Sequence, residues 1–342
     1  MSGEFLEGPA AGPPPGSCAD PVREVPAGAP GGRWVRVSAP AKINLVLRVA
    51  TRGGDGFHRL STVFHAVSLR DRLSLTDQPG RISVTTRGGY ARHVADDETN
   101  LAVRAVAAVR DRFGSPGMGA RIAIDKSIPV AGGMAGGSAD CAAALVGAAR
   151  LWDLDVGDGE LFELAAALGS DVSFSLLGGT ALGTGRGERL EPLVCGGPLH
   201  WVLAAARRGL PTPTVYGRFD ERVAAGTSVP MSAERVHPAD LIDALARGDA
   251  AAAAALLVND LQQAALDLYP ELAGTLAAGR GAGALAGIVS GSGPTCAFLC
   301  ADGSSAADVA AVLRGSPEVT AVLTATGAAP GALGPAEDTD FR

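Results

Sequence analysis

A run of ten residues, PVAGGMAGGS at 129–138, constrains the fold of this chain more than any other feature. The segment before it, 120–125, alternates like a strand, and the alanine-rich segment after it, 139–152, predicts a helix. The four glycines of the run remove side chains, so that backbone N–H groups can approach an anion, and the helix N-terminus adds partial positive charge. The strand–loop–helix order therefore favours a triphosphate cradle over a flexible surface loop.

Two common glycine-rich nucleotide loops do not fit this run. A Walker A loop needs a Gly-Lys pair, but neither of the chain's two lysines, Lys42 and Lys126, follows a glycine. The later G-x-G at 281–283 follows a predicted helix, whereas a dinucleotide-binding turn follows a strand. A different kind of cradle is therefore expected, with the Ser138 hydroxyl placed to reach a phosphate or a Mg²⁺ ion.

Composition limits the size of the fold and the class of partner. The 342 residues are 47% hydrophobic, which suits one large domain or two ordinary domains with full cores. The formal net charge of −7 argues against nonspecific nucleic-acid binding, which needs a basic surface. The longest uncharged stretch, 281–301, is broken by glycines and a proline, so no membrane span is expected.

The cysteines and the two ends of the chain complete this picture. Five cysteines form no C-x-x-C pair, so buried free thiols are expected rather than a disulfide framework or a zinc site. The first residues lack the apolar run of a signal peptide, which predicts a soluble, cytoplasmic protein. Proline and glycine dominate 1–32, which predicts a disordered leader, and 327–342 reads as a flexible tail.

Periodicity predicts an α+β fold in two lobes, 33–186 and 187–326. The segment 34–49 alternates like a strand pair that Pro40 interrupts or places at an edge. Helices and strands are mixed without a regular βαβ succession. The other expected strands are 63–69, 72–76, 201–206, 288–289, 295–300 and 319–324, and the other expected helices are 100–113, 160–168, 239–247, 250–264, 271–279 and 305–314.

Asp171 and Lys42 are candidate catalytic residues. Asp171 follows a predicted helix and could orient or deprotonate a hydroxyl, but it is also a natural N-cap for the next short helix, and the residues alone favour the cap. Lys42 shares a strand face with Asn44, and its ammonium could neutralise a transferring phosphoryl group. The alternative is an ordinary solvated strand face.

A third cluster is Gly56-Phe57-His58, after a glycine-rich turn. An aromatic ring beside a histidine could grip a nucleobase by stacking and hydrogen bonding. A lone histidine is more often structural, and the other four show no metal-ligand spacing.

Taken together, these segments resemble the GHMP kinase superfamily. PAKINL at 40–45 and DGFH at 55–58 point to its branch that phosphorylates a cytidylyl-bearing alcohol for isoprenoid precursors. The resemblance implies a two-lobed α+β GHMP kinase fold, with a ribosomal S5 domain 2-like N-terminal lobe, a ferredoxin-like C-terminal lobe and the active site between them. The other matching segments are 129–140, 168–171, 178–180, 185–188, 211–213 and 290–294.

The resemblance also implies roles for the matching residues. Lys42 and Asp171 are the implied catalytic pair, and the cofactors are ATP and Mg²⁺, with Ser138 as a metal ligand. The turn at 290–294 is implied to support the nucleotide loop. The implied ATP-binding residues are Pro129, Val130, Ala131, Gly132, Gly133, Met134, Ala135, Gly136, Gly137, Ser138 and Ala139, with Asn100 and Lys126 near the adenine. The implied substrate-binding residues are Asn44, Phe57, His58 and Tyr216.

The glycine-rich run departs from the usual pattern of the superfamily branch at three positions. Met134, Ala135 and Ala139 replace leucine, glycine and serine. The extra methyl group of Ala135 leaves the cradle intact if its backbone avoids positive φ, and the missing hydroxyl at 139 removes one possible phosphate contact. Phe57 replaces a more usual tyrosine, which keeps the stacking surface.

The implied activity is ATP-dependent phosphorylation of the 2-hydroxyl of that alcohol, by a monomer or weak homodimer that binds neither nucleic acid nor membrane. The nearest alternative is a related kinase acting on mevalonate, homoserine or a sugar, although such substrates would not need a base-stacking site. A noncatalytic nucleotide-binding regulator is a second alternative. A nucleic-acid-binding module is a third, against which the negative charge argues.

Overall fold

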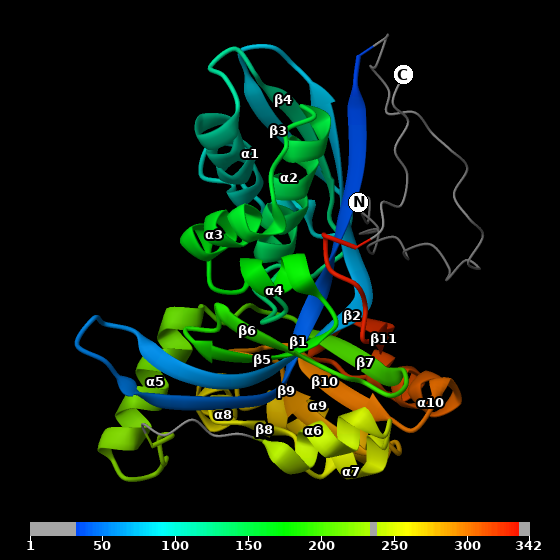
Figure 1. Cartoon of the computed structure of the whole chain (residues 1–342). Coiled ribbons are helices and arrows are strands. Elements are labelled where there is room, and N and C mark those ends of the chain that lie inside the picture. The colour runs from blue at the N-terminus through cyan, green and yellow to red at the C-terminus, as the bar shows by residue number, and fades with distance from the viewer. Residues whose placement is uncertain (1–31, 233–237, 335–342) are drawn as a thin grey trace, which may run out of the picture. The chain divides into compact units, whose positions relative to one another are not determined.

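The computed structural model describes residues 32–232 and 238–334, which belong to one compact unit beginning at Gly32. Among these residues the strands form two sheets (Figure 1). The first has seven strands, with the order β3-β4-β2-β1-β8 and with β5 and β6 attached beside β2. Its members are β1 (Trp34–Arg52), β2 (His58–Asp77), β3 (Ile82–Arg87), β4 (Ala120–Asp125), β5 (Thr180–Gly185), β6 (Arg189–Leu193) and β8 (Val258–Asn259).

Strands β1 and β2 form a long antiparallel hairpin. In Figure 1 it runs from the upper part of the molecule, beside β3 and β4, to the lower part, beside β5 and β6. The predicted strand pair at 34–49 is in fact one strand, because a register shift between Pro40 and Ala41 absorbs the proline without ending the ladder. The segments 63–69 and 72–76, expected as two strands, are likewise parts of the single strand β2.

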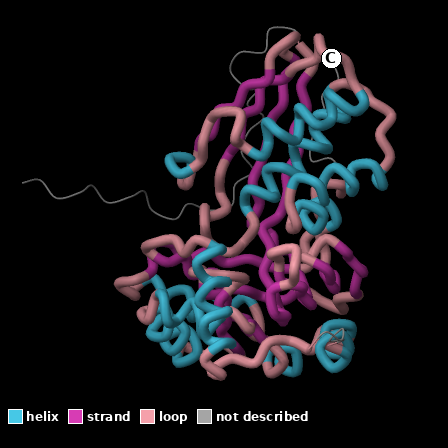
Figure 2. The backbone as a smooth tube through the Cα atoms, turned by 90° about the vertical axis from the view of Figure 1, so that its left-hand side faces the viewer, coloured by secondary structure: helices cyan, strands magenta, loops and turns pink. Residues whose placement is uncertain are grey.

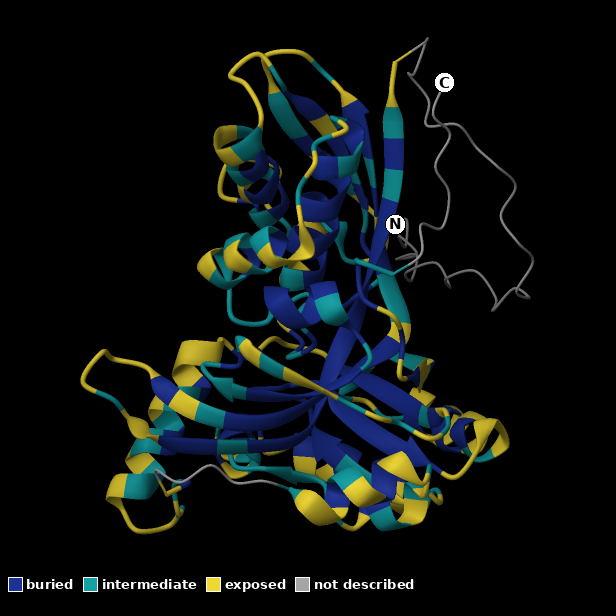
Figure 3. Cartoon of the chain, in the orientation of Figure 1, coloured by how far each residue is buried: buried dark blue, intermediate teal, exposed yellow. Residues whose placement is uncertain are grey.

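Helices α1 (Leu101–Phe113), α2 (Gly136–Leu151), α3 (Asp158–Leu168) and α4 (Val172–Leu177) lie to one side of the first sheet (Figure 2). Almost every residue of α2 is buried, because it packs against β1, β2, α1 and α4 at once. Its small side chains allow these close approaches on all sides. Figure 3 shows it as an almost continuous dark blue segment. A 3₁₀ turn, Ala91–His93, precedes α1.

The second sheet has the order β11-β7-β10-β9. Aromatic and aliphatic side chains from this sheet and its helices, among them Tyr269 and Phe298, form a second core. The strands of this second sheet are β7 (Leu199–Ala206), β9 (Ala286–Val289), β10 (Cys296–Cys300) and β11 (Val319–Gly327). The helices of this half are α5 (Thr212–Ala224), α6 (Ala239–Ala246), α7 (Ala250–Ala254), α8 (Gln262–Leu268), α9 (Leu272–Gly281) and α10 (Gly303–Arg314).

The predicted helix at 250–264 is wrong, and helix α5, which follows Pro211, was not predicted. The first breaks into α7, β8 and α8, because Val258 and Asn259 pair in parallel with β1. That pairing is a long-range contact that helical periodicity cannot show. In α5, Pro213 stands in the first turn, where its missing N–H costs nothing.

The expected boundary at residue 186 does not coincide with a change of sheet. Strands β5 and β6 lie on either side of it and pair with each other within the first sheet. The chain reaches the second sheet only at β7, and residues of β7 such as Trp201 pack in the same core as the first sheet. The two lobes therefore share a core, and their limits stay a prediction.

The segment 327–334 is packed, contrary to the flexible tail expected there. The Ala329 N–H donates to the Ala66 carbonyl at 3.0 Å, and the Ala332 N–H donates to the Ser175 carbonyl at 2.9 Å. Both alanines are buried. Small residues allow this approach, since a Cβ at Gly178 would fall 2.0 Å from the backbone of 331. Residues 1–31 of the expected leader, 1–32, and residues 335–342 lie outside the described residues.

Two further expectations concern cysteines and the membrane. Cys141, Cys296 and Cys300 are free and buried and Cys195 is free and half-buried, which confirms the expected thiols for all but Cys18, which lies outside the described residues. None of the helices in the described part of the chain combines the length and the apolarity needed to cross a bilayer.

Candidate active site

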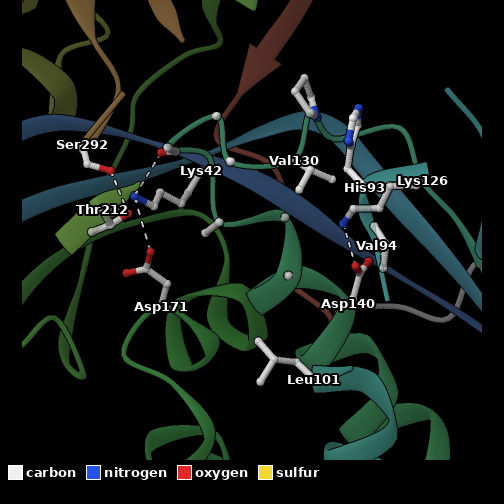
Figure 4. Close-up of a pocket in the computed structure, with 18 of the residues that line it drawn as sticks. Lys42, His93, Val94, Leu101, Lys126, Val130, Asp140, Asp171, Thr212 and Ser292 are labelled. Atoms are coloured by element: carbon white, nitrogen blue, oxygen red, sulfur yellow. Dashed lines mark hydrogen bonds and ion pairs between the residues drawn. The ribbon is translucent and has the colours of Figure 1, made fainter. Parts of the chain in front are cut away.

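The glycine-rich run forms one wall of a cavity of about 440 Å³, the nucleotide cavity (Figure 4). Met134 and Ala139 do not line it, because their side chains are buried in the core. Ser138 faces a neighbouring cavity instead. The members of the run that do line the nucleotide cavity are Pro129, Val130, Ala131, Gly132, Gly133, Ala135, Gly136 and Gly137.

The backbone of the run is left-handed at alternate positions, Ala131, Gly133 and Ala135, with φ of 54°, 75° and 57°. Ala135 therefore does not meet the condition set above, that its backbone avoids positive φ. Ala135 adopts that conformation at a cost of about 1–2 kcal/mol, and backbone of this kind forms concave anion sites. Helix α2 begins at Gly136, so its first-turn N–H groups lie at the cavity wall.

The turn between β9 and β10 presses directly against this run. A Cβ at Gly133 would fall 2.1 Å from the Ser290 carbonyl oxygen, and a Cβ at Gly132 would fall 2.8 Å from the Thr295 hydroxyl. The Ser290 hydroxyl also donates to the Gly133 carbonyl at 3.1 Å. The turn at 290–294 therefore supports the loop from the second sheet, as expected, and the two glycines are required by close packing.

That turn is itself held by Asn259, which sequence reasoning missed, and by Thr212, from the matching segment 211–213. The Asn259 amide donates to the carbonyls of Val289 and Gly291, each at 2.7 Å. The hydroxyls of Thr212 and Ser292 lie 2.9 Å apart and join the start of α5 to the turn (Figure 4). No local pattern marks Asn259, because its function depends on the pairing of β8 with β1.

Lys42 lies where the loop, the turn and α4 meet. Its Nζ donates to Asn44 Oδ1 at 2.8 Å and lies 3.4 Å from the Gly133 carbonyl. Asn44 in turn donates to the Thr62 hydroxyl at 2.8 Å. All three polar side chains are buried. The amide that was predicted to touch substrate therefore also fixes the position of the ammonium.

Asp171 completes a pair with Lys42, its Oδ2 lying 3.5 Å from Lys42 Nζ. Figure 4 shows the two side chains pointing toward one another. Asp171 occupies the N-cap position of α4, as the residues alone favoured, but its side chain accepts no capping hydrogen bond. The carboxylate is instead about one-third exposed and faces the cavities.

Lys126, at the other side of Figure 4, is buried between two carboxylates. Its Nζ lies 2.5 Å from Asp71 Oδ2 and 2.6 Å from Asp140 Oδ2. Asp71 also accepts the N–H groups of Ser127 and Ile128, so the cluster ties the end of β4 to α2. Burial raises the pKa of Asp140 above its ordinary value, although the charge of Lys126 opposes the rise.

The predicted adenine residues thus line the nucleotide cavity with their polar groups already engaged. Asn100 caps α1 by accepting from the Ala102 N–H at 2.9 Å, and it donates to the Ala95 carbonyl at 2.7 Å. Lys126 is held by its two carboxylates. Val94, Leu101 and Val130 supply apolar surface beside them (Figure 4).

A second cavity of about 450 Å³, the substrate cavity, adjoins the first. Leu60, Asp171, Thr212 and Tyr216 line both, so Asp171 stands at their junction. Such an arrangement allows a group bound in one cavity to be passed to a hydroxyl held in the other. The remaining lining residues are Arg52, Gly56, Phe57, His58, Ser138, Ser170, Arg186 and Pro213.

The substrate cavity brings together three predicted base-binding residues from two distant segments, Phe57 and His58 from one and Tyr216 from the other. The rings of His58 and Tyr216 lie 4.9 Å apart between centroids, with an interplanar angle of 39°. Burial, and then the charge of Asp171, raise the pKa of Tyr216. Phe57 is 51% exposed, and the Arg186 guanidinium lies 4.9 Å from its ring centroid. Asn44 is the exception, since it lines only the nucleotide cavity.

Two sections of the chain match known family descriptions. Residues 100–179 match the GHMP kinases N terminal domain, and residues 241–318 match the GHMP kinases C terminal. The first section contains the glycine-rich run, Lys126 and Asp171.

Whole-chain relatives are similar over nearly their full length. A 4-diphosphocytidyl-2-C-methyl-D-erythritol kinase of Streptomyces coelicolor is 54% identical over 299 residues, which cover 87% of this chain and 98% of the relative. The enzyme of the same name from Rhodococcus jostii is 53% identical over 301 residues, 88% of this chain and 94% of its own.

Solved structures agree with this relationship. A crystal structure of 4-(cytidine 5'-diphospho)-2C-methyl-D-erythritol kinase superposes with a TM-score of 0.69 at 33% identity, covering 85% of this chain and 98% of its own. A homoserine kinase from Cytophaga hutchinsonii has a TM-score of 0.67 at 18% identity, with coverages of 88% and 96%. The homoserine kinase shares the two-lobed fold, and its identity is too low to carry more than that.

Proposed function

The chain belongs to the family of 4-diphosphocytidyl-2-C-methyl-D-erythritol kinases within the GHMP kinase superfamily, and we propose that it phosphorylates the 2-hydroxyl of 4-diphosphocytidyl-2-C-methyl-D-erythritol with ATP. The observation that carries this proposal is the position of Asp171, which lines both cavities and lies 3.5 Å from Lys42. The hydroxyl oxygen forms a bond to the γ-phosphorus, the bond from that phosphorus to the bridging oxygen breaks, and ADP leaves.

ATP occupies the nucleotide cavity in this proposal. The first-turn N–H groups of α2 and the left-handed backbone at 131–135 face the phosphates and offset their charge. Adenine lies against the apolar wall near Leu101 and Val130. Asn100 and Lys126 shape that wall through the helix cap and the buried ion pairs, since their side-chain polar groups are already bonded.

Lys42 and Asp171 carry the chemistry. Asp171 orients the substrate hydroxyl and accepts its proton as the oxygen attacks. The Lys42 ammonium stabilises the negative charge that spreads over the transferring phosphoryl group. Asn44 holds Lys42 in place through the 2.8 Å hydrogen bond, so the cation is positioned before ATP arrives.

A magnesium ion fits beside the Ser138 hydroxyl, which lines the substrate cavity. The described residues contain no group of three or more histidine, cysteine or carboxylate side chains suited to hold a metal. Mg²⁺ needs no such cage, because it keeps several waters and binds substrate phosphates with one or two protein oxygens. Ser138 is the residue that would hold it, and the ion would neutralise phosphate charge during transfer.

The cytidylyl group occupies the substrate cavity. Phe57 and Tyr216 offer ring surfaces to the base, and His58 reads its edge. A substrate without a base would leave these rings without a partner.

An ADP-release assay tests the proposal. The substrates are 4-diphosphocytidyl-2-C-methyl-D-erythritol, mevalonate and homoserine, each with ATP and Mg²⁺, and Asp171→Ala is the control. We expect turnover of the cytidylyl substrate alone, and loss of that turnover in the variant. Turnover of another alcohol would contradict the assignment of the substrate cavity. No ADP release with any of the three substrates, together with measurable ATP binding, would indicate a noncatalytic nucleotide-binding protein.

A further inference from the structure

The imidazole of His58 is held by a carboxylate that lines neither cavity. His58 Nε2 lies 2.7 Å from Oδ1 of Asp220, on α5, while the ring itself lines the substrate cavity. The His58 side chain is 6% exposed and that of Asp220 34%. An ionised carboxylate can only accept a hydrogen bond, so the proton of this bond belongs to Nε2.

Helix α5 encloses the ring from one face. Tyr216, Phe219 and Asp220 stand at helical spacings of three and four, so they lie on the same side of α5. The Tyr216 ring lies 4.9 Å from the imidazole between centroids, and the Phe219 ring meets it edge-on at 6.3 Å. These contacts fix the plane of the imidazole, and the carboxylate fixes which nitrogen points toward the helix.

The other ring nitrogen has no partner in the described part of the chain. Within the described residues, the His58 side chain makes a single hydrogen bond, through Nε2. Nδ1 is also not one of the fully buried polar atoms that lack a hydrogen-bond partner, so it remains accessible. In a neutral imidazole one nitrogen donates and the other accepts. With the proton held on Nε2, Nδ1 is an open acceptor.

We propose that Asp220 is a positioning residue that keeps the proton of His58 on Nε2, so that Nδ1 accepts a hydrogen bond from the base of the substrate. This inference rests on the proposed function, because it takes the substrate cavity as the place of the base. Cytosine carries an amino donor where uracil carries a carbonyl oxygen. An acceptor at Nδ1 binds the amino group and opposes the carbonyl oxygen, so Asp220 contributes to selection of cytidine over uridine.

Binding of free nucleotides tests this without any chemical step. CDP and UDP are titrated calorimetrically into the protein with a non-hydrolysable ATP analogue filling the nucleotide cavity. We expect the wild type to bind CDP at least about tenfold more tightly than UDP, the factor expected for one mispaired hydrogen-bonding group. In Asp220→Ala that ratio falls toward one. A purely structural effect would weaken both nucleotides equally and leave the ratio unchanged.

Glu221→Ala is the matched control. Glu221 is the next residue of α5, and its side chain is 68% exposed and paired with Arg218. Its loss removes the same charge from the same helix, and its side chain lines neither the nucleotide cavity nor the substrate cavity and makes no contact with His58. We expect this variant to keep the CDP/UDP ratio of the wild type. A lowered ratio in Glu221→Ala would show that net charge, rather than the His58 contact, is responsible.

Long-range ¹H–¹⁵N NMR correlation reports the tautomer directly. The chain has only five histidines, and the signals of His58 are identified by their absence in His58→Gln. We expect a proton on Nε2 alone in the wild type and a mixture of tautomers in Asp220→Ala. A wild-type proton on Nδ1, or an unchanged CDP/UDP ratio in folded Asp220→Ala, would overturn the inference. Failure of the wild type to phosphorylate the cytidylyl substrate would instead overturn the proposed function.

Discussion

The nucleotide cavity and the substrate cavity differ in the groups that form their walls. Backbone and close glycine contacts make the first, since Gly133 allows the Ser290 carbonyl to lie where a Cβ would be. Side chains from the β1–β2 turn and from α5 make the second, with Phe57 half exposed. A backbone wall recognises charge and shape common to all nucleotides, whereas a wall of side chains can change its ligand by single substitutions.

The two cavities also differ in how their charges are held. At the nucleotide cavity Lys126 is fully enclosed by Asp71 and Asp140, and such a buried cluster fixes geometry more than it contributes stability. At the junction Lys42 and Asp171 lie 3.5 Å apart, a looser pair whose carboxylate remains accessible. The enclosed cluster of three charges suits a scaffold, and the accessible pair suits chemistry.

Loss of the ammonium at the junction is expected to have the largest effect. Lys42→Met removes the charge that we propose stabilises the transferring phosphoryl group, and we expect kcat to fall at least about 100-fold to 1,000-fold. Steady-state kinetics measure kcat, and thermal unfolding checks that the variant is folded. Arg48→Met, on the same strand, is the control and should retain most activity. A kcat within threefold of the wild type would remove Lys42 from the mechanism.

Gly133→Ala tests whether the nucleotide cavity depends on backbone packing. The new Cβ would fall 2.1 Å from the Ser290 carbonyl oxygen at a residue with φ of 75°. We expect a loss of about 2–3 kcal/mol in the free energy of unfolding, and a KM for ATP raised at least about tenfold. Urea unfolding and initial rates measure these quantities.

Gly274→Ala makes the same chemical change where nothing lies within 4 Å of the added methyl. It stands in α9, so we expect a gain of about 0.5–1 kcal/mol and an unchanged KM. Equal behaviour of the two variants would contradict the view that the loop is held by direct contact with the β9–β10 turn.

Acid is expected to disturb both cavities together, because they share one scaffold. Burial lowers the pKa of His65 from 6.5 to about 4. The unfolded chain therefore takes up a proton that the folded chain refuses, and stability falls as the pH drops from 6.5 through about 4. His65 lies on β2 beside Trp201 of β7, where the two sheets meet.

His65→Gln removes this titration. Between about pH 7 and about pH 4 we expect the variant to lose about 3 kcal/mol less stability than the wild type, measured by urea unfolding. His200→Gln, at a half-buried histidine of β7, is the control. Parallel pH profiles for His65→Gln and the wild type would show that His65 does not control the acid response.

The smallest effect is expected at Phe57. Phe57→Tyr adds a hydroxyl to a ring that is 51% exposed, so we expect less than about a threefold change in the KM for the cytidylyl substrate. Phe57→Ala removes the ring and its contact with Arg186, worth about 0.5–1 kcal/mol at an exposed site. Its KM should rise further than that of the tyrosine variant. A larger rise in KM for Phe57→Tyr than for Phe57→Ala would mean that the ring does not face the base.

Much of the architecture was predictable from local patterns. The strand 120–125, helix α1 and the helix after the glycine-rich run all lie where periodicity placed them, because each buries one clear face or, in α2, every face. The errors at 34–49 and 250–264 have a common cause. Register shifts and parallel pairing with a distant strand leave no local mark.

The site shows the same division. Lys42, Asp171 and His58 were chosen as candidates from their residue type and neighbours, and the fold brings Lys42 and Asp171 together. Asp71, Asp220 and Asn259 were missed, because an aspartate or asparagine within a strand or helix has many ordinary uses. Only the partner identifies its function, and each of these three bonds to a group that lies 30 or more positions away in the chain.

By itself the sequence determined the kind of chemistry, because a glycine-rich run between a strand and a helix creates an anion site through local backbone geometry. Only the tertiary structure decided which side chains work there. Asp171, at the N-cap position of α4, pairs its side chain with Lys42 rather than with the helix backbone, and Lys126 became the centre of a buried cluster. The physical reason is that local conformation depends on neighbouring residues, whereas the position of a charge depends on which distant groups the fold brings within a few ångströms of it.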